Sequence, residues 1–586
     1  MRAPDHGGGS ASIRSWVDIK GLVLQVLTGR WLMVFASFLM MVTAGASYMF
    51  GLYSDIKFVL GYDQTTLNLI SFFKDLGANV GILSGLINEV TPPWVVLSIG
   101  AVLNFFRHFM IWLAITQKIP KPRVWHMCLY MSIGANSHTS TNTGALVTCV
   151  KNFPESRGVV LGLLKGYTGI SAAVISQLYH AAYGDDTKSF TLVVAWLPTA
   201  LSLVFIGTIR IIKASRRPNE LRAFYNFLYI SLGLAALLLI IIVVEKRFRF
   251  SQSQYVGSAA VVLFLLFLPL AVVIMEEYKV WQSKRSISQN LDSDPSPVKI
   301  VTKGQNPDAI SSPTYKKVPS WNKDILNPPE IGEDFTILQA LFSIEMLTLL
   351  LATVCGLGGT MTMMDNLGQI GTSFGYPLQS IRNFVSLTSI WNFLGQIVAG
   401  IGSEMFIIKY KWPRPLIFTA VLLLSCVGHL LIAFNVPYGL YVSSVVTGFC
   451  FGAHWPLIFT LISELFGLKY YSTLYNFGGL ASPIGLYLLN VRVTGYLYDK
   501  EAKKQMAALG LQRKVGEELN CVGGQCFKLS FIILAVVALF GALVSLLLVV
   551  RTRKFYKSDI YKKFRDKVRV AWTGIVVAKT AASGGY

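Results

Sequence analysis

Fourteen long apolar stretches constrain this chain more than any other feature of its 586 residues. A helix of about 20 apolar residues matches the roughly 30 Å hydrocarbon core of a bilayer, and a soluble protein has no use for so many. The sequence therefore predicts an all-α protein that crosses a membrane many times. The expected spans are 31–52, 67–88, 94–116, 125–149, 158–180, 190–212, 223–244, 256–275, 337–360, 380–402, 414–434, 438–464, 471–491 and 529–550.

The first six and the last six expected spans resemble one another at similar offsets, between 313 and 318 residues. Two similar six-helix halves in the same order are typical of transporters that move about a site at the bilayer midplane. Two extra spans between the halves leave the orientation of both unchanged. The matching positions are Gly61-Tyr62 with Gly375-Tyr376, Gly81 with Gly395, Gly134-Ala135 with Gly452-Ala453, and Phe153 with Phe466.

Composition and charge agree with a membrane protein. The chain is 53% hydrophobic and 14% charged, with a mean hydropathy of +0.53. A net charge of +22 would suggest nucleic acid for a soluble protein. Here the positive-inside rule explains it better, because 33 of the 52 Lys and Arg fall on one side when both termini are cytoplasmic, against 15 on the other. We therefore expect the lipid bilayer as partner, no nucleic acid, and the plasma membrane or vacuolar membrane as location.

The segments outside the two halves have distinct compositions. Residues 1–30 form an expected cytoplasmic tail, and 31–275 form the first half with the two extra spans. The Ser-, Pro- and Lys-rich segment 276–336 predicts a disordered cytoplasmic linker. Residues 337–550 form the second half. The basic tail 551–586 fits either a helix on the anionic leaflet or a solvated tail.

Two of the seven cysteines stand apart from the rest. Cys521 and Cys526 flank a Gly-Gly pair in the last expected outside loop, where an oxidising compartment would allow a local disulfide. Two free thiols are the alternative. The other cysteines lie in or beside expected spans, where packing is the simplest role.

Long motifs in both halves resemble the nodulin-like branch of the plant major facilitator superfamily, which includes the nuclear-fusion-defective-type proteins. The likeness covers both halves and stops in the tails and the linker. It implies a transporter fold related to oxalate/formate and monocarboxylate carriers, without a defined substrate. The motifs are GRWLMVFASFLMMVTAGASYMFGLYSDIK at 29–57, FFKDLGANVGILSGLI at 72–87, NTGALVTCVKNFPESRG at 142–158, GLLKGYTGISAA at 162–173, FGAHWPLIFTLISELFGLKYYSTLYNFG at 451–478 and CVGGQCF at 521–527.

The resemblance also indicates where a conformational latch should lie. In typical members, the loop after the second span of a half carries one acidic and several basic residues. The first half has only Glu89 there, whereas the second half has Glu404, Lys411 and Arg414. We therefore expect the latch to depend on the second half.

Several polar residues lie within expected spans, where a charged side chain costs roughly 2.5–3.5 kcal/mol. Asp75 could titrate for proton coupling or could pair with a basic neighbour such as Arg107. Asn136 and His138 in the span 125–149, and His454 in the span 438–464, are candidate cavity residues, although structural bonding is the common role of such groups. Tyr48, a candidate for substrate binding, and Glu345, a candidate for proton coupling, lie in the first span of each half.

Lys165 is the strongest candidate for substrate binding. It lies about a third of the way along the span 158–180, between Gly162 and Gly166, whose spacing allows close helix packing. Its counterpart in the second half is Gly478, so the shared scaffold does not require a cation here. An ammonium in the cavity would attract anions. A lysine that extends to the interface is the alternative.

The spacing of titratable residues gives no support to an enzyme, a metal site or a cofactor site. We expect a monomeric, secondary active carrier of a small organic anion such as a carboxylate, driven by protons. The alternatives are a scaffold or receptor that keeps the transporter fold without flux, and a carrier of neutral solutes such as sugars or amino acids.

Overall fold

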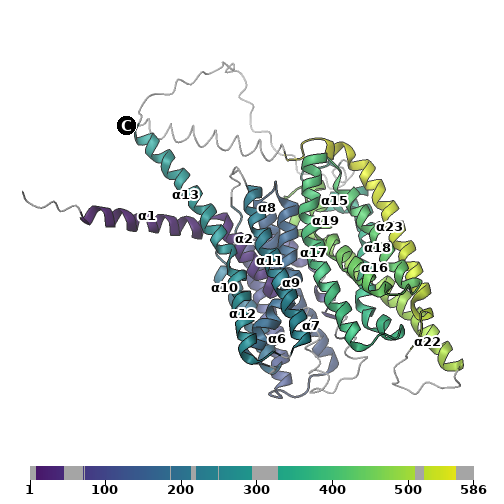
Figure 1. Ribbon diagram of the computed structural model, residues 1–586. Helices are drawn as coiled ribbons and strands as arrows, with labels where there is room; N and C mark the ends of the chain where they lie inside the picture. The colour runs from purple at the N-terminus through teal and green to yellow at the C-terminus, as the bar shows by residue number, and fades with distance from the viewer. Residues whose placement is uncertain are drawn as a thin grey trace, which may run out of the picture.

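The structure is a computed structural model, and its regular elements are helices (Figure 1). It describes residues 8–44, 70, 73–74, 76–78, 80–184, 187–212, 220–248, 250–293, 328–508 and 521–561.

The first half of the chain forms one helical bundle. Helix α9 packs against α2, and α6 packs against both α7 and α10. The helical run from Val124 to Asn152 includes a short π-helical segment, a feature that often marks functional positions. The elements are α1 (Gly8–Thr28), α2 (Arg30–Ala44), α5 (Ile82–Val90), α6 (Pro93–Ile115), α7 (Val124–Thr141), η3 (Asn142–Val147), α8 (Thr148–Asn152), α9 (Arg157–Tyr183) and α10 (Thr187–Phe205).

The second half forms a bundle beside the first (Figure 1). Helix α17 packs against α19, and α18 packs against α19 and α23. Across the two halves, α9 lies along α17. The elements are α15 (Ile337–Phe342), α16 (Ile344–Ser373), α17 (Leu378–Tyr410), α18 (Arg414–Ala433), α19 (Gly439–Leu465), α20 (Tyr471–Gly479), α21 (Ala481–Leu486), η4 (Tyr487–Gly495), α22 (Tyr496–Ala508) and α23 (Gln525–Lys557).

The two extra spans are α11 (Glu220–Arg247) and α12 (Gln252–Phe267), and both pack against α9 of the first half. Helix α13 (Pro269–Ser293) continues from α12 and also contacts α2. Phe224 and Phe227 place their rings 5.3 and 5.9 Å from that of Trp31. At the same level Arg30 forms an ion pair with Glu220. The extra helices therefore enlarge the outer side of the first half.

Fourteen spans are not confirmed. Among the described residues, nine helices are long and apolar enough to cross a membrane, or ten if the bent pair α1 and α2 counts as one. The remaining expected spans fall on residues outside the described ranges or on helices that are short, interrupted or polar. The run 471–491, for example, is divided between α20, α21 and η4.

Both ends of the expected disordered linker 276–336 are ordered in the structure, and its middle lies outside the described residues. Helix α13 continues to Ser293, and a segment before α15 packs on the second half, where the Gly332 amide donates to the Leu465 carbonyl at 2.9 Å and the Phe335 amide to that of Phe466 at 3.1 Å. Most of the basic tail lies outside the described residues. Its beginning, 551–557, continues α23 as helix.

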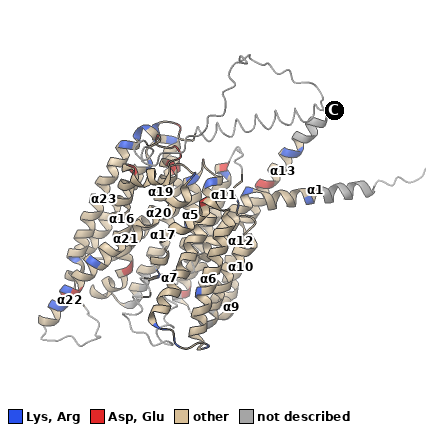
Figure 2. Ribbon diagram, turned by 180° about the vertical axis from the view of Figure 1, so that it is seen from behind, with Lys and Arg blue, Asp and Glu red and all other residues tan. Residues whose placement is uncertain are grey.

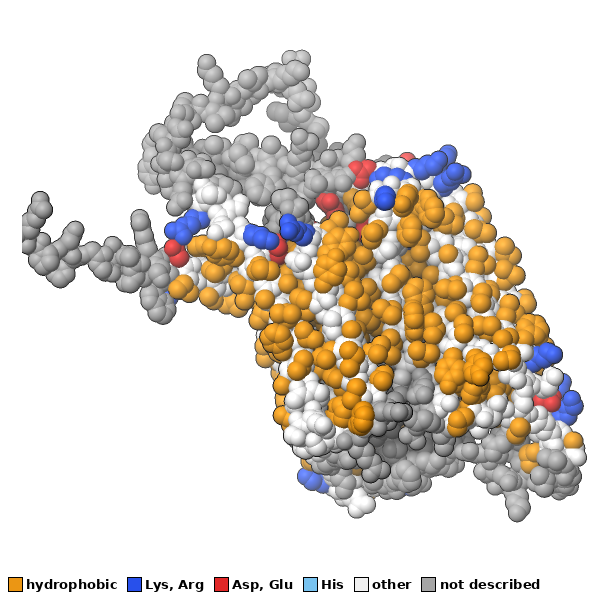
Figure 3. Space-filling view, in the orientation of Figure 1, with side chains coloured by type: hydrophobic (Ala, Val, Ile, Leu, Met, Phe, Trp, Pro, Cys, Tyr) orange, Lys and Arg blue, Asp and Glu red, His pale blue; other side chains and the backbone are white. Residues whose placement is uncertain are grey.

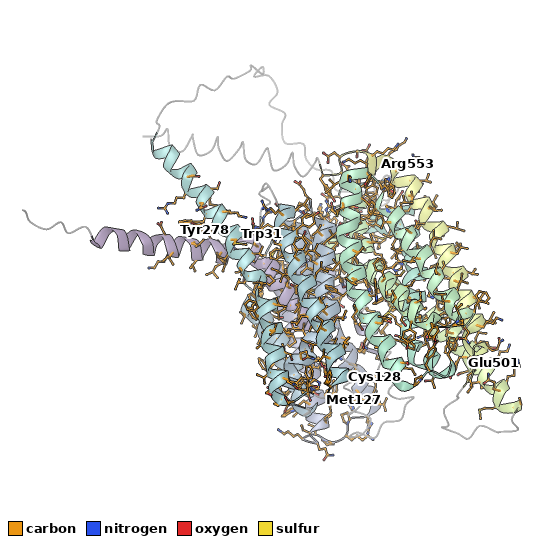
Figure 4. All side chains as sticks on the ribbon, viewed as in Figure 1. Trp31, Met127, Cys128, Tyr278, Glu501 and Arg553 are labelled. Atoms are coloured by element: carbon orange, nitrogen blue, oxygen red, sulfur yellow. A yellow bond between two sulfur atoms is a disulfide. The ribbon has the colours of Figure 1, made fainter. Side chains whose placement is uncertain are left out.

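The two ends of the bundle can be told apart by labelled residues (Figure 4). Trp31, Tyr278 and Arg553 lie toward one end, here named the linker end; Met127, Cys128 and Glu501 lie toward the other, here named the disulfide end. Lysines and arginines gather at the linker end of α13 and α23 and again on α22 (Figure 2). At the disulfide end, the structure joins Cys521 to Cys526, the bonded one of the two states considered above.

Candidate functional site

A cavity of about 810 Å³ lies between the two halves. Helices α7 and α9 line it from the first half, and α16, α17, α19 and the run from α20 to η4 line it from the second. It extends from Phe459 and Lys165 to Asp365 and Asn490, which lie toward the disulfide end of their helices. The position between two repeated halves is where transporters of this architecture bind their substrates.

Lys165 lies at one end of this cavity and is 8% exposed. Its Nζ lies 5.4 Å from the ring centre of Trp455, 5.2 Å from that of Phe459 and 5.7 Å from that of Tyr475. No carboxylate of the described residues lies within ion-pair distance of it. Aromatic faces attract the ammonium but carry no formal charge. Among the described residues, the Lys165 amine therefore has aromatic neighbours and no counter-charge, and it faces the cavity instead of extending to the interface.

His138 also lines the cavity, and its Nδ1 lies 3.1 Å from the Ala44 carbonyl oxygen. Asn136, expected beside it, does not line the cavity. Its amide donates to the Val80 carbonyl at 2.6 Å, while its side-chain oxygen accepts from the Ser84 hydroxyl at 3.5 Å. Asn136 therefore ties two helices of the first half together.

His454 does not line the cavity, contrary to expectation. It is fully buried in the second half, with Nδ1 2.6 Å from the Cys450 carbonyl oxygen and its ring edge-on to that of Phe418 at 5.3 Å. Trp455, one residue later, faces the cavity instead. One residue is a rotation of about 100° around a helix, which is enough to exchange the two roles.

Glu345 is likewise placed away from the cavity. It lies in the first turn of α16, and its carboxylate accepts from Arg551 Nε at 2.8 Å. This ion pair joins the linker ends of α16 and α23. Tyr48 and Asp75, the other candidates near the first half's polar helices, lie outside the described residues.

Sequence reasoning missed most of the polar cavity lining. Asn142, Asn392 and Gln396 contribute carboxamides, and Lys74 and Asp365 contribute charges. The side-chain amide of Asn490, another lining residue, donates to Asp365 at 3.4 Å. Lys74 was visible as a charge in an apolar run. The carboxamides gave no signal beyond lowering local hydropathy.

The expected latch of the second half is a buried charge cluster at the linker end. Arg414 donates to Glu464 at 3.0 and 2.9 Å and to Glu404 at 2.9 Å. Tyr556 donates to Glu464 at 2.7 Å, and Tyr561 donates to Glu404 at 2.7 Å. Burial, together with Glu404 and Glu464 nearby, raises the pKa of Tyr561 well above its ordinary value, so its phenol stays protonated and donates.

Lys411 is not part of this cluster. It ends α17 in the left-handed backbone region, with φ of 54°, and its side chain is exposed. Glu464, which sequence reasoning did not select, accepts two of the three bonds from Arg414 to carboxylates. An acidic residue at the end of an apolar run was the available signal.

Glu89 connects the two halves at the linker end. Its carboxylate accepts from the backbone amides of Ser472 at 2.7 Å and Thr473 at 3.3 Å, at the start of α20, and pairs with Lys151 at 3.2 Å. An anion at a helix N-terminus is favoured by the helix dipole. This single acidic residue therefore joins the first half to the second. Further contacts between the halves are Asn88 to Ser472 at 2.8 Å, Asn476 to Thr143 at 2.8 Å and Arg157 to the Ser463 carbonyl at 2.6 Å.

The fold and the cavity define a membrane protein of the major facilitator type. The structure superposes on a double-Trp mutant of XylE, a proton:xylose symporter of that superfamily, with a TM-score of 0.52 and 12% identity over 88% of this chain and 95% of the other. At that identity the likeness shows the fold alone.

Residues 30–274 match the nodulin-like family, and residues 331–558 match the C-terminal domain of the NFD4 family. This chain belongs to the nodulin-like proteins of the major facilitator superfamily and is a multi-pass membrane protein. It is 24% identical to Protein NUCLEAR FUSION DEFECTIVE 4 of Arabidopsis thaliana over 93% of this chain and 92% of that one. It is 19% identical to Probable transporter MCH1 of Wickerhamomyces anomalus over 78% and 77%.

Proposed function

We propose that this protein is a secondary active transporter that carries a small organic anion, such as a carboxylate, by alternating access and with protons as the driving ion. The observation that carries the proposal is the position of Lys165, whose ammonium faces the cavity between the halves without a carboxylate partner among the described residues.

The surroundings of Lys165 favour an anionic substrate. A buried charge in a membrane costs a few kcal/mol, while a cation–π contact returns about 0.5–2 kcal/mol. An incoming carboxylate would supply the missing charge through a strong charge-assisted hydrogen bond. Arg414 differs, because Glu404 and Glu464 already neutralise its charge, and a structural role therefore suits it better than substrate binding.

The contacts between the halves support alternating access. At the linker end, Glu89 of α5 accepts a hydrogen bond from the first turn of α20 and so joins the two halves. The cavity, in contrast, extends toward the disulfide end. Releasing this contact would let the halves separate at the linker end. The same contact argues against a scaffold with a degraded latch, because Glu89 still makes it.

We propose His138 as the residue that couples protons to transport. It shares the cavity with Lys165, and its imidazole can take up and release a proton. A bound anion would favour the protonated imidazole, so that proton and anion bind together.

A second candidate is the transport of a neutral polyhydroxylated solute. Asn142, Asn392, Gln396 and Asn476 line the cavity with carboxamides, which both donate and accept hydrogen bonds. Such a lining suits sugars. It does not explain a buried lysine, and we rank this function second.

Uptake into liposomes containing the purified protein tests the proposal. Labelled carboxylates, amino acids and sugars are offered with and without an inward proton gradient, with protein-free liposomes as control. We expect carboxylate uptake that the gradient accelerates. Sugar uptake without carboxylate uptake would favour the second candidate, and no uptake of any solute would favour a scaffold.

A further inference from the structure

Helix α1 leaves the bundle sideways at the linker end. Its residues Asp18–Thr28 meet α2 at an angle of 52°, across Gly29 (Figure 1). Arg30, directly after the bend, pairs with Glu220, and the Trp31 amide donates to Glu277 at 3.3 Å. Charged groups gather where a membrane-spanning helix reaches the headgroups. The bend therefore lies at the level of the membrane surface.

One face of α1 is fixed on α13. Gln25 donates to Glu277 at 2.6 Å, and Arg285 pairs with Asp18 at 2.9 Å. Gly21 brings the two helices close, because a Cβ placed there would lie 3.1 Å from Trp281 Nε1. The orientation of α1 about its own axis is set by these contacts.

The opposite face is unpartnered among the described residues and carries exposed apolar side chains together with the exposed Lys20, whose long stem can reach from an apolar surface to the headgroups. Ile19, Val23, Leu24 and Leu27 are 52%, 50%, 62% and 58% exposed. Positions 19, 23 and 27 are spaced by four and share one side of the helix, and Leu24 flanks them. In Figure 3, the apolar side chains around α1 lie on the side that continues into the apolar surface of the bundle. Charged side chains lie on the other side of this helix pair.

We propose that α1 lies in the plane of the membrane surface, with Ile19, Val23, Leu24 and Leu27 buried in the boundary between headgroups and acyl chains. An amphipathic helix at this depth places its apolar face in lipid and its polar face toward water. The occupant of the face is the bilayer in which the bundle sits, because the helix emerges at its surface and its apolar side continues the lipid-facing surface.

Charge supports the same occupant. Lys20 on α1 is exposed, and Lys279 and Lys284 are exposed on α13, which braces it. Basic side chains beside a membrane surface are attracted by anionic headgroups. The brace also fixes the start of the segment between the halves to the membrane. Residues Asp18–Thr28 are then a membrane-bound element instead of part of a free cytoplasmic tail.

Spin labels test this placement. Leu24→Cys and Val23→Cys are labelled in the full chain, in vesicles of phosphatidylcholine and phosphatidylglycerol, and collisions with oxygen and with a water-soluble nickel complex are compared. Ser283→Cys on the exposed side of α13 is the matched control, and labelled wild type gives the background of the native cysteines.

We expect oxygen to relax the labels at Leu24 and Val23 several-fold more than the nickel complex, and the reverse at Ser283. Nickel-dominated relaxation at Leu24 and Val23 would place the helix in water and overturn the proposal. Protection from both reagents would show a protein partner on this face and would overturn it as well.

Discussion

Two buried cations in this protein have different surroundings, and these suggest different roles. Arg414 is fully buried and is held by Glu404 and Glu464, so its charge is balanced within the protein. Lys165 has three aromatic rings around it and no carboxylate among the described residues. The first arrangement is complete without a ligand, whereas the second leaves a charge for one to neutralise.

The arginine cluster predicts a large effect on stability from one substitution. Removing one partner of a buried ion pair costs about 3–5 kcal/mol. Glu464→Gln removes the carboxylate that serves Arg414, Tyr556 and Tyr561. We expect a clearly lower melting temperature in detergent. Glu501→Gln, which removes a surface ion pair with Lys504, is the matched control and should change little. Equal melting of the two variants would show that the cluster does not stabilise this state.

The sequence predicted the location of a residue correctly where its charge required a partner of opposite charge. Glu404 and Arg414 were expected in a latch and lie together, because buried charges must pair. The prediction that His454 lines the cavity was wrong. The side of a helix that faces the cavity can be read from an amphipathic pattern, and α19 is apolar on all sides. For the same reason, nothing in the sequence distinguished Gln396 and Asn392 from the many other polar residues.

At the scale of elements, glycines determine how closely the halves approach. Gly158, Gly162 and Gly166 lie on the side of α9 that faces α17. A Cβ at Gly162 would lie 2.9 Å from both the Gln396 carbonyl oxygen and Gly400 Cα. Small residues four apart allow such contact between membrane helices. This spacing was read from the sequence around Lys165, but its partner helix was not.

Gly162→Ala should therefore destabilise this arrangement. The added methyl group meets backbone atoms, which cannot rotate away, and overpacking of this kind costs about 1–3 kcal/mol. We expect a lower melting temperature in detergent. Gly207→Ala adds the same group where no atom lies within 4 Å and should melt like wild type. If Gly162→Ala melts as high as Gly207→Ala, the close packing of α9 on α17 is wrong.

Element existence was more predictable than element count. Strongly apolar runs such as α11 and α23 were easy to identify because their central stretches are almost entirely hydrophobic. The helices around the cavity are harder, since Asn136, His138 and Thr143 make the run from Val124 to Asn152 polar. A polar cavity requires such residues, and they lower the hydropathy by which a membrane span is recognised in the sequence.

At the scale of the whole molecule, the two halves and the cavity between them follow from the repeat and from the apolar spans. The orientation in the membrane rests on the distribution of Lys and Arg and on Cys521–Cys526, since a disulfide requires an oxidising side. Both predict that the linker end faces the cytoplasm.

A membrane-impermeant maleimide tests this orientation in intact cells that carry the protein at their surface. Lys500→Cys on α22 is exposed at the disulfide end, and Lys409→Cys is exposed at the linker end of α17. We expect Lys500→Cys to react in intact cells and Lys409→Cys only after permeabilisation, with wild type as background. The opposite pattern would invert the topology.

The central claim is that the charge of Lys165 binds the substrate. Uptake of the carboxylate that wild type carries best is compared in liposomes containing wild type, Lys165→Ala, Lys165→Arg or Lys409→Ala, at equal amounts of folded protein. A charge-assisted bond of about 1.5–3 kcal/mol predicts a loss of roughly tenfold or more in affinity for Lys165→Ala. Lys165→Arg should lose less because the charge remains, and Lys409→Ala, at an exposed site, should resemble wild type. If Lys165→Ala transports the anion with the wild-type rate and affinity, Lys165 does not bind substrate and the account is wrong.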